Sequence, residues 1–233
     1  YQLTEDFEKA SQLLEKQIQD FPNQPHLNIE LGYNFQLQNQ KEKAIPYYDL
    51  ALESIEENAN KGYLIGSTFK DNHLLDYALK AYLRAMELNP ELHYDAYVAS
   101  IYGEQAEIEK MFDAYLNMIE KNKSYFSTVQ RYAGRFITDD SQESNNILFR
   151  KLLLKRVQTT PNDSWNILLS WLFVQQKDYA KALIQEKALF RRNLEDLNRI
   201  VDLGIVAFEN KDYETSKNTF EYILENTNDP NAQ

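Results

Sequence analysis

Three histidines are the side chains of this sequence best suited to bind a metal ion or to transfer a proton, and they stand far apart. They are His26, His73 and His93. A zinc site needs ligands at short spacings, as in the His-Glu-x-x-His motif, which this sequence lacks. Each histidine is therefore expected on a helix surface or in a turn, and no metal ligand is predicted.

Adjacent carboxylates could provide acid–base catalysis, and the sequence has several pairs, such as Glu56-Glu57 and Asp139-Asp140. Two carboxyls do this work only where a pocket drives their pKa values apart. These pairs are expected at solvated helix ends. The stretch Gly66-Ser67-Thr68 lacks the lysine and upstream glycine of a phosphate-binding loop, and no Gly-x-Ser-x-Gly motif occurs. We therefore predict no catalytic or cofactor-binding residue and no enzyme activity.

The composition is that of a folded protein. The 233 residues are 43% hydrophobic and 26% charged, and no apolar run approaches the roughly 18 residues that span a bilayer. The absence of cysteine excludes disulfides, thiolate metal sites and cysteine nucleophiles. A net charge of −11 disfavours nucleic acid as a partner, because phosphates repel such a surface. Exported, periplasmic and cytoplasmic locations all stay open.

The charge is unevenly distributed along the chain. Residues 1–120 hold 9 basic and 21 acidic residues, whereas residues 121–233 hold 16 and 15. The acidic half could prefer basic partners, or it could simply be a set of solvated helix faces. The second interpretation is favoured.

A period of 34 residues organises the sequence. Ala10, Ala44 and Ala78 stand 34 apart, and so do the pairs Leu31-Gly32 and Ile65-Gly66. The spacing returns near the end, where Lys-Asp-Tyr occurs at 177–179 and 211–213, and where Leu169-Ser170 precedes Leu203-Gly204. A small residue beside a large apolar one lets two helices of a hairpin approach closely. Pro22, Pro90 and Pro161 are expected to stop helices.

These residues resemble the tetratricopeptide repeat (TPR) family, whose pattern is Trp-x2-Leu-Gly-x2-Tyr, then Ala-x3-Phe, then Pro. The chain looks like the long bacterial TPR proteins, some of which carry an export signal upstream. The resemblance implies an all-α, right-handed superhelical solenoid of antiparallel helix pairs, with about six and a half repeats, thirteen helices and a concave face. Tyr48, Tyr82, Phe35 and Phe69 occupy core positions of the repeat.

The chain 1–233 is expected to form a single solenoid that begins on an unpaired second helix. The fourth unit lies about one residue short of the period. The fifth is stretched by a polar segment, 139–146, in which Asp140 or Ser141 could cap the next helix; this segment could be a binding loop or a plain insertion. Both ends carry apolar residues, so the chain is expected to be part of a longer array. The expected units lie near 4–21, 25–57, 59–89, 92–122, 124–159, 163–193 and 195–227.

Partners of TPR arrays typically bind on the first helix of each pair, along a stripe with spacings of four and three residues. The predicted partner-binding residues on that stripe are Tyr33, Gln36, Tyr63, Ser67, Lys70, Ser100, Gln130, Trp171, Val174, Ile205 and Phe208. The other stripe positions are Ile29, Ala96, Gly103, Gly134, Ile137, Ile167 and Val201.

One TPR subclass grips C-terminal carboxylates with lysine and asparagine on these stripes. Here Ile29 and Tyr63 stand where lysine is needed, and Tyr33 and Ser67 where asparagine is needed. Binding of chaperone C-termini through such a clamp is therefore disfavoured.

The stripe is apolar in the last two units, where Trp171, Val174, Ile205 and Phe208 are expected to form one patch. The patch could be a groove for a peptide or partner helix, or it could pack on further repeats. The sequence predicts a non-enzymatic scaffold that binds a protein or peptide. The alternative is a regulatory or assembly domain of a larger protein whose chemistry lies outside this chain.

Overall fold

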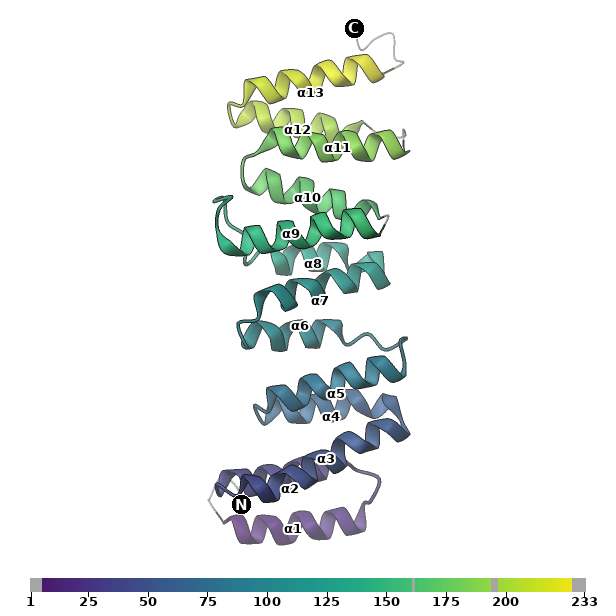
Figure 1. Cartoon of the computed structure of the whole chain (residues 1–233), viewed down its shortest axis with the longest axis vertical. Helices are drawn as coiled ribbons and strands as arrows, with labels where there is room; N and C mark the ends of the chain where they lie inside the picture. The colour runs from purple at the N-terminus through teal and green to yellow at the C-terminus, as the bar shows by residue number, and fades with distance from the viewer. Residues whose placement is uncertain (1–5, 161, 194–196, 228–233) are drawn as a thin grey trace. The chain divides into compact units, whose positions relative to one another are not determined.

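The computed structural model describes residues 6–160, 162–193 and 197–227, which form two compact units, 1–106 (unit 1) and 107–233 (unit 2). The described residues contain thirteen α-helices and no strand, as the all-α prediction requires (Figure 1). The boundary between the units falls inside the expected fourth repeat, 92–122. The organisation of 1–233 as one array and its right-handed superhelical course stay predictions.

Unit 1 is a stack of helix hairpins. Its helices are α1 (Phe7–Asp20), α2 (His26–Leu37), α3 (Lys41–Glu57), α4 (Gly62–Asp71), α5 (Leu75–Leu88) and α6 (Asp95–Glu104), with a 3-10 turn at Ala59–Lys61. The hairpins α2–α3 and α4–α5 are the closest packed pairs. The first helices of the two hairpins, α2 and α4, also contact each other, and so do the second helices, α3 and α5. This stacking of pairs is that of a helical solenoid.

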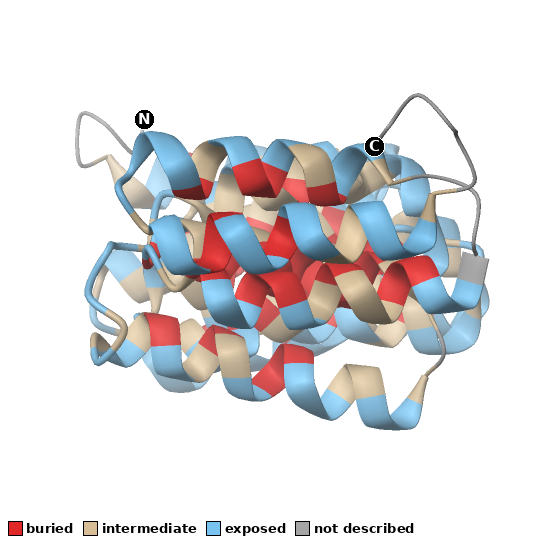
Figure 2. Ribbon diagram, turned by 90° about the horizontal axis from the view of Figure 1, so that it is seen from above, coloured by how far each residue is buried: buried red, intermediate tan, exposed pale blue. Residues whose placement is uncertain are grey.

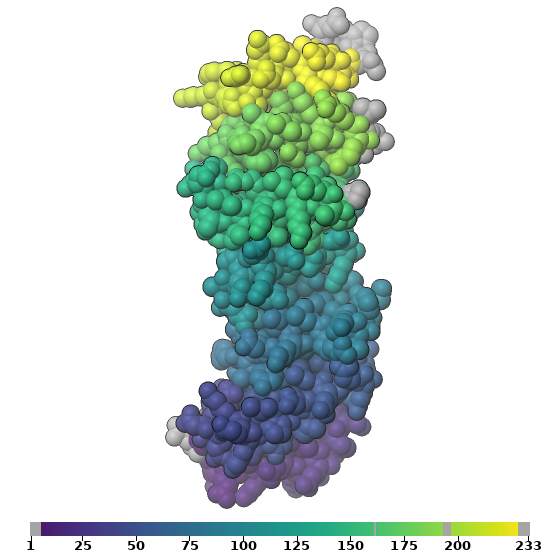
Figure 3. Space-filling model, in the orientation of Figure 1, coloured from purple at the N-terminus to yellow at the C-terminus, as the bar shows by residue number. Residues whose placement is uncertain are grey.

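Unit 2 continues the pattern with one irregular pair. Its helices are α7 (Ile108–Lys121), α8 (Phe126–Ala133), α9 (Ser144–Thr159), α10 (Asp163–Gln175), α11 (Tyr179–Asn193), α12 (Asn198–Glu209) and α13 (Tyr213–Asn226), with a 3-10 turn at Lys123–Tyr125. The pairs α10–α11 and α12–α13 are close hairpins, while α7 packs against both α8 and α9. In Figure 3, successive helix pairs of this unit form successive bands of the surface.

The helices bury one side and expose the other, as the colouring of Figure 2 shows along individual helices. The repeat alanines Ala10, Ala44 and Ala78 are 5%, 1% and 0% exposed, so each lies in the core as the 34-residue period predicts. Tyr48 and Tyr82 are buried as well. The burial therefore follows the repeat register that the sequence indicates.

Phe35 differs from its prediction as a core residue. Its side chain is only partly buried, and it stacks on Tyr47 with ring centroids 5.6 Å apart. Phe69, one repeat later, is fully buried against Tyr48 and Tyr77. Phe35 has one aromatic neighbour, Tyr47, whereas Phe69 is packed between two.

The turn between the two helices of a pair repeats in its backbone as well. Five residues other than glycine have φ between 57° and 68°, and they are Asn39, His73, Ala106, Lys177 and Lys211. Asn39 and His73 stand 34 residues apart, His73 and Ala106 stand 33 apart, and Lys177 and Lys211 stand 34 apart. The spacing of 33 matches the short spacing expected at the fourth unit. Each follows the end of a first helix, where a left-handed residue satisfies the last carbonyls.

The helix ends agree with two of the three proline predictions. Helix α1 ends at Asp20, two residues before Pro22, and α5 ends at Leu88, two before Pro90. Pro161 lies outside the described residues. Helix α9 is capped by Glu143, whose carboxylate accepts from the backbone N–H groups of Asn145 and Asn146, and not by Asp140 or Ser141. The prediction of that cap is wrong because the polar segment continues for three further residues in a turn of its own.

Candidate partner-binding site

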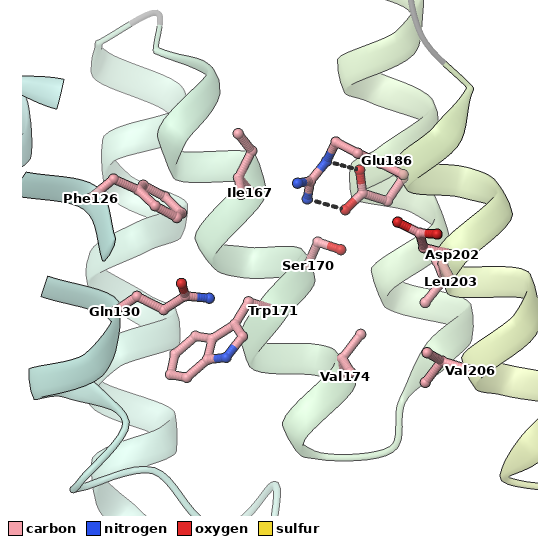
Figure 4. A pocket seen from close by; sticks show the side chains of 11 residues that line it. Phe126, Gln130, Ile167, Ser170, Trp171, Val174, Glu186, Asp202, Leu203 and Val206 are labelled. Carbon is pink, nitrogen blue, oxygen red and sulfur yellow. Dashed lines mark hydrogen bonds and ion pairs between the residues drawn. The ribbon is translucent and has the colours of Figure 1, made fainter. Parts of the chain in front are cut away.

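A pocket of about 300 Å³ opens on unit 2 between the first helices of three successive pairs. Helix α8 contributes Phe126 and Gln130, and one side each of α10 and of α12 completes the wall (Figure 4). Helix α11 adds one carboxylate, Glu186, at one end. We name this the α8–α10–α12 pocket; its residues are Phe126, Gln130, Ile167, Ser170, Trp171, Val174, Glu186, Arg199, Asp202, Leu203 and Val206.

The floor of the pocket is apolar and is centred on Trp171. The indole is partly exposed, and its Cζ2 would lie 3.4 Å from a β-carbon on Gly134 at the end of α8. Phe149 of α9 meets the indole edge to face, with centroids 6.5 Å apart. Gly134 therefore leaves room for the ring, Phe149 packs against it, and Val174 extends the apolar surface one turn further along α10.

One end of the pocket holds an ion pair with matched geometry. The Nε of Arg199 donates to Oε2 of Glu186 at 2.8 Å, and its Nη2 donates to Oε1 at 2.7 Å. The Glu186 side chain is 4% exposed, whereas that of Arg199 is 46% exposed. The buried carboxylate therefore has both oxygens bonded by one guanidinium, which links α11 to α12.

Three polar side chains of the pocket are not used within the fold. The amide of Gln130, the hydroxyl of Ser170 and the carboxylate of Asp202 make no side-chain hydrogen bond or ion pair with any other described residue, but Ser170 is only 3% exposed, so Gln130 and Asp202 are the accessible groups. They come from α8, α10 and α12 in turn, and Figure 4 shows them around the apolar floor. An apolar floor with a few convergent free polar groups is typical of a ligand-binding site.

The comparisons with known proteins give no family. No protein-family model matches the chain, and no curated protein matches it. Among solved structures, one similar chain belongs to the "Structure of Naa15/Naa10 bound to HypK-THB", with 15% sequence identity and a TM-score of 0.40. The match covers 94% of this chain and 34% of that one, so this chain spans about a third of the length of the protein it matches.

The structure brings together three of the five residues predicted in unit 2. Gln130, Trp171 and Val174 line the pocket, and Ile167 of the same stripe joins them. Ile205 and Phe208 do not: they are 45% and 59% exposed, and Phe208 packs on Tyr213 with ring centroids 5.5 Å apart. Ile205 and Phe208 thus lie outside this pocket, and the single apolar patch expected from Trp171, Val174, Ile205 and Phe208 stays a prediction.

The reason is the side that each first helix presents. Helix α12 lines the pocket with Arg199, Asp202, Leu203 and Val206, each two positions before the repeat equivalents of the α10 lining residues. Two positions are about 200° round a helix. A groove between neighbouring first helices is lined by opposite sides of the two, so one register cannot describe both. Applying the period to the opposite side would have found these residues.

In unit 1 the predicted stripe residues are mostly bonded within the fold. The Nζ of Lys70 on α4 donates to Oγ of Ser100 on α6 at 2.8 Å and lies 2.9 Å from Oε1 of Glu104. Gln36 accepts from the hydroxyl of Tyr48 at 3.2 Å, and the Ser67 hydroxyl donates to the Leu64 carbonyl of its own helix. These residues share first helices, but their polar groups are occupied.

The remaining unit 1 positions fall into two kinds. Tyr63 is 48% exposed and contacts Tyr94 and Tyr97, with centroids 6.3 and 5.5 Å away. Tyr33 is partly exposed on α2, whereas Ile29 of the same stripe is fully buried and belongs to the core. Tyr63 and Tyr33 thus stay at the surface of unit 1.

The side chains considered for chemistry are dispersed. Across the described part of the chain, no group of three or more His, Asp or Glu residues is placed to hold a metal ion. Glu56 receives two hydrogen bonds from Arg84, at 2.6 and 2.7 Å, and these lower the pKa of its carboxyl. Asp139 pairs with Lys177 at 3.1 Å. Both carboxylates thus serve ion pairs between repeats. None of the described helices has the length and apolar character to cross a membrane.

Proposed function

We propose that this chain is a non-enzymatic protein-interaction scaffold of the tetratricopeptide type, which binds a protein or peptide segment in the α8–α10–α12 pocket. The observation that carries the proposal is the partly exposed Trp171, which packs on Phe149 beside Gly134 and is flanked by polar groups that the fold leaves free. Rigid aromatic anchors at the centre of a polar rim are typical of the residues that dominate protein interfaces.

The shape of the pocket supports a peptide more than a compact small molecule. Its three helices present their sides in succession, so the lining repeats along the groove. An extended segment or an amphipathic helix can place side chains at such repeating positions. The same binding role suits a regulatory or assembly domain of a larger protein, which is the alternative to a free-standing scaffold.

The test is selection of short random peptides displayed on phage against the full chain. We expect enriched peptides whose affinity falls at least about tenfold in Trp171→Ala, as for a central aromatic anchor. The matched control is Ile184→Ala, because Ile184 is 63% exposed on α11 and lies outside the pocket. Circular dichroism and thermal melting establish that both variants fold. Peptides that bind both variants equally, or no enrichment, contradict the proposal.

A further inference from the structure

The charges of the α8–α10–α12 pocket are unequal in a way that points to its ligand. Two carboxylates and one guanidinium line it, namely those of Glu186, Asp202 and Arg199. The positive charge of Arg199 is balanced by Glu186, to which it donates two hydrogen bonds of 2.8 and 2.7 Å. The pair is therefore neutral as a unit, and Asp202 supplies the charge that is left.

An anionic ligand has no free cation to meet in this pocket. Arg199 can offer a carboxylate or phosphate only the N–H groups that Glu186 leaves unused, because turning away would strand the Glu186 carboxylate, which is 4% exposed. A buried carboxylate without its partner is strongly unfavourable. The positive charge of Arg199 is already balanced, and the nearby Asp202 carboxylate repels an anion. A cationic group, in contrast, meets the exposed Asp202 carboxylate without breaking any bond of the fold.

The apolar floor lies beside that free carboxylate. Leu203 and Val206 stand one and four residues after Asp202 on α12, and Val174 lies opposite Val206 on α10, while the Trp171 ring extends the apolar lining toward Gln130 of α8. An apolar side chain seated on this floor places the neighbouring residue of the same peptide near Asp202. At the other side the Gln130 amide offers an NH2 donor group and a carbonyl acceptor, which match a peptide group of a bound segment.

We infer that the pocket selects a peptide segment in which an apolar side chain stands next to a lysine or arginine, with the apolar group on Trp171 and the cation on Asp202. The inference rests on the proposed function and specifies its partner.

The experiment compares two phage libraries of short peptides that differ in one fixed residue, a leucine followed by lysine or a leucine followed by glutamate. Each is panned against the full chain at low and at high salt. We expect about three- to fivefold higher retention of the Leu-Lys library at low salt, the range of one exposed ion pair. The preference should shrink at high salt because exposed charges are screened.

Variants of Asp202 test whether its carboxylate causes the preference for the Leu-Lys library. Asp202→Asn should abolish it, and Asp202→Lys should reverse it in favour of Leu-Glu. Glu209→Gln is the matched control, since Glu209 is an exposed carboxylate on the same helix, makes no ion pair with a described residue and lies outside the pocket. Thermal melts of all three variants verify folding.

The possible results separate this inference from the proposed function. Retention that depends on Trp171 but is equal for both libraries, or a preference that survives Asp202→Asn, overturns the inference and leaves the scaffold function standing. A preference for Leu-Glu in the wild-type chain overturns it as well. If neither library binds in a Trp171-dependent way, both the inference and the proposed function fail.

Discussion

The ring of Tyr82 lies so close to Gly66 that a β-carbon at position 66 would stand 2.6 Å from it. The same relationship holds one repeat earlier, where a β-carbon on Gly32 would stand 2.6 Å from the ring of Tyr48. Glycine on the first helix and tyrosine on the second thus fit each other as a pair. The 34-residue recurrence of Leu-Gly or Ile-Gly has this contact as its physical cause.

Gly66→Ala should therefore destabilise unit 1. Alanine gains about 1 kcal/mol in helix propensity over glycine, but the buried Tyr82 ring has to move, and overpacking of a core costs about 1–3 kcal/mol. We expect a net loss of the order of 1 kcal/mol in urea unfolding. Gly204→Ala is the comparison: its nearest contacts are 3.0 and 3.1 Å and include the partly exposed Phe220, so it should lose less. Equal effects at both sites would contradict this account.

Tyr82 also makes the stability of unit 1 sensitive to alkali. Burial, with the neighbouring tyrosines adding to it, raises the pKa of its phenol well above the ordinary value of 10.0. Above pH 10 the unfolded chain loses this proton while the folded chain keeps it, so stability falls as pH rises. Tyr82→Phe should make that fall shallower.

The same substitution should cost little at neutral pH, because the Tyr82 hydroxyl is buried without a hydrogen-bond partner. Tyr48→Phe is the contrast, since it removes the hydrogen bond to Gln36 and should cost about 0.5–1.5 kcal/mol. Urea unfolding at pH 7 and at a series of pH values above 9 tests both statements. An unchanged alkaline slope in Tyr82→Phe would refute the first.

Much of the fold was predictable because the same packing contact occurs in successive repeats. Ala44 and Ala78 lie at the crossings, Gly32 and Gly66 at the close approaches, and each has a partner at a fixed distance along the chain. The left-handed turn residues were missed, because four of the five are not the glycine or asparagine that usually marks such a turn. Their backbone is imposed by the packed helices on either side.

That imposed conformation predicts a stabilising substitution. Lys211 has φ of 68° and is exposed, so its side chain contributes little to balance the strain of a left-handed backbone. Lys211→Gly should raise the free energy of unfolding by about 0.5–1 kcal/mol, whereas Lys211→Ala should not. Asn39→Gly should gain less, since asparagine already tolerates this region. Thermal melts of the three variants decide the matter.

Asn146 holds the stretched turn between α8 and α9. Its side chain is fully buried, accepts from the backbone N–H of Thr138 at 3.2 Å, and donates to the carbonyls of Thr138 and Asp140 at 2.9 and 2.5 Å. Asn146→Ala should cost about 1–3 kcal/mol and increase hydrogen exchange in residues 134–143. Asn145→Ala, which loses a single 3.4 Å bond to Phe136, serves as the control. Unchanged exchange would show that the turn is held elsewhere.

The binding site was less predictable than the fold, for a geometric reason. The α10 half of the pocket follows from the repeat, because Trp171 and Val174 sit beside the packing pair Leu169-Ser170. The α12 half lies on the opposite side of its helix, two positions before the repeat equivalents, so the period finds it only if neighbouring first helices are known to line a groove with opposite sides. Arg199 and Asp202 are separated by one helical turn, but only the buried Glu186 on α11 shows that one charge is matched and the other is free.

The ion pair between Arg199 and Glu186 should also stabilise unit 2. Arg199→Gln leaves the Glu186 carboxylate, 4% exposed, without its two hydrogen bonds. Removing one partner of a fully buried pair costs about 3–5 kcal/mol, and the half-exposed guanidinium reduces the expected loss to about 1–3 kcal/mol. Adding Glu186→Gln to this variant should recover part of the loss, because no buried charge then remains. Urea unfolding of the two single variants and the double variant measures the coupling. If Arg199→Gln costs nothing, the pair does not fix α12 against α11, and Glu186 does not hold Arg199 away from an anionic ligand.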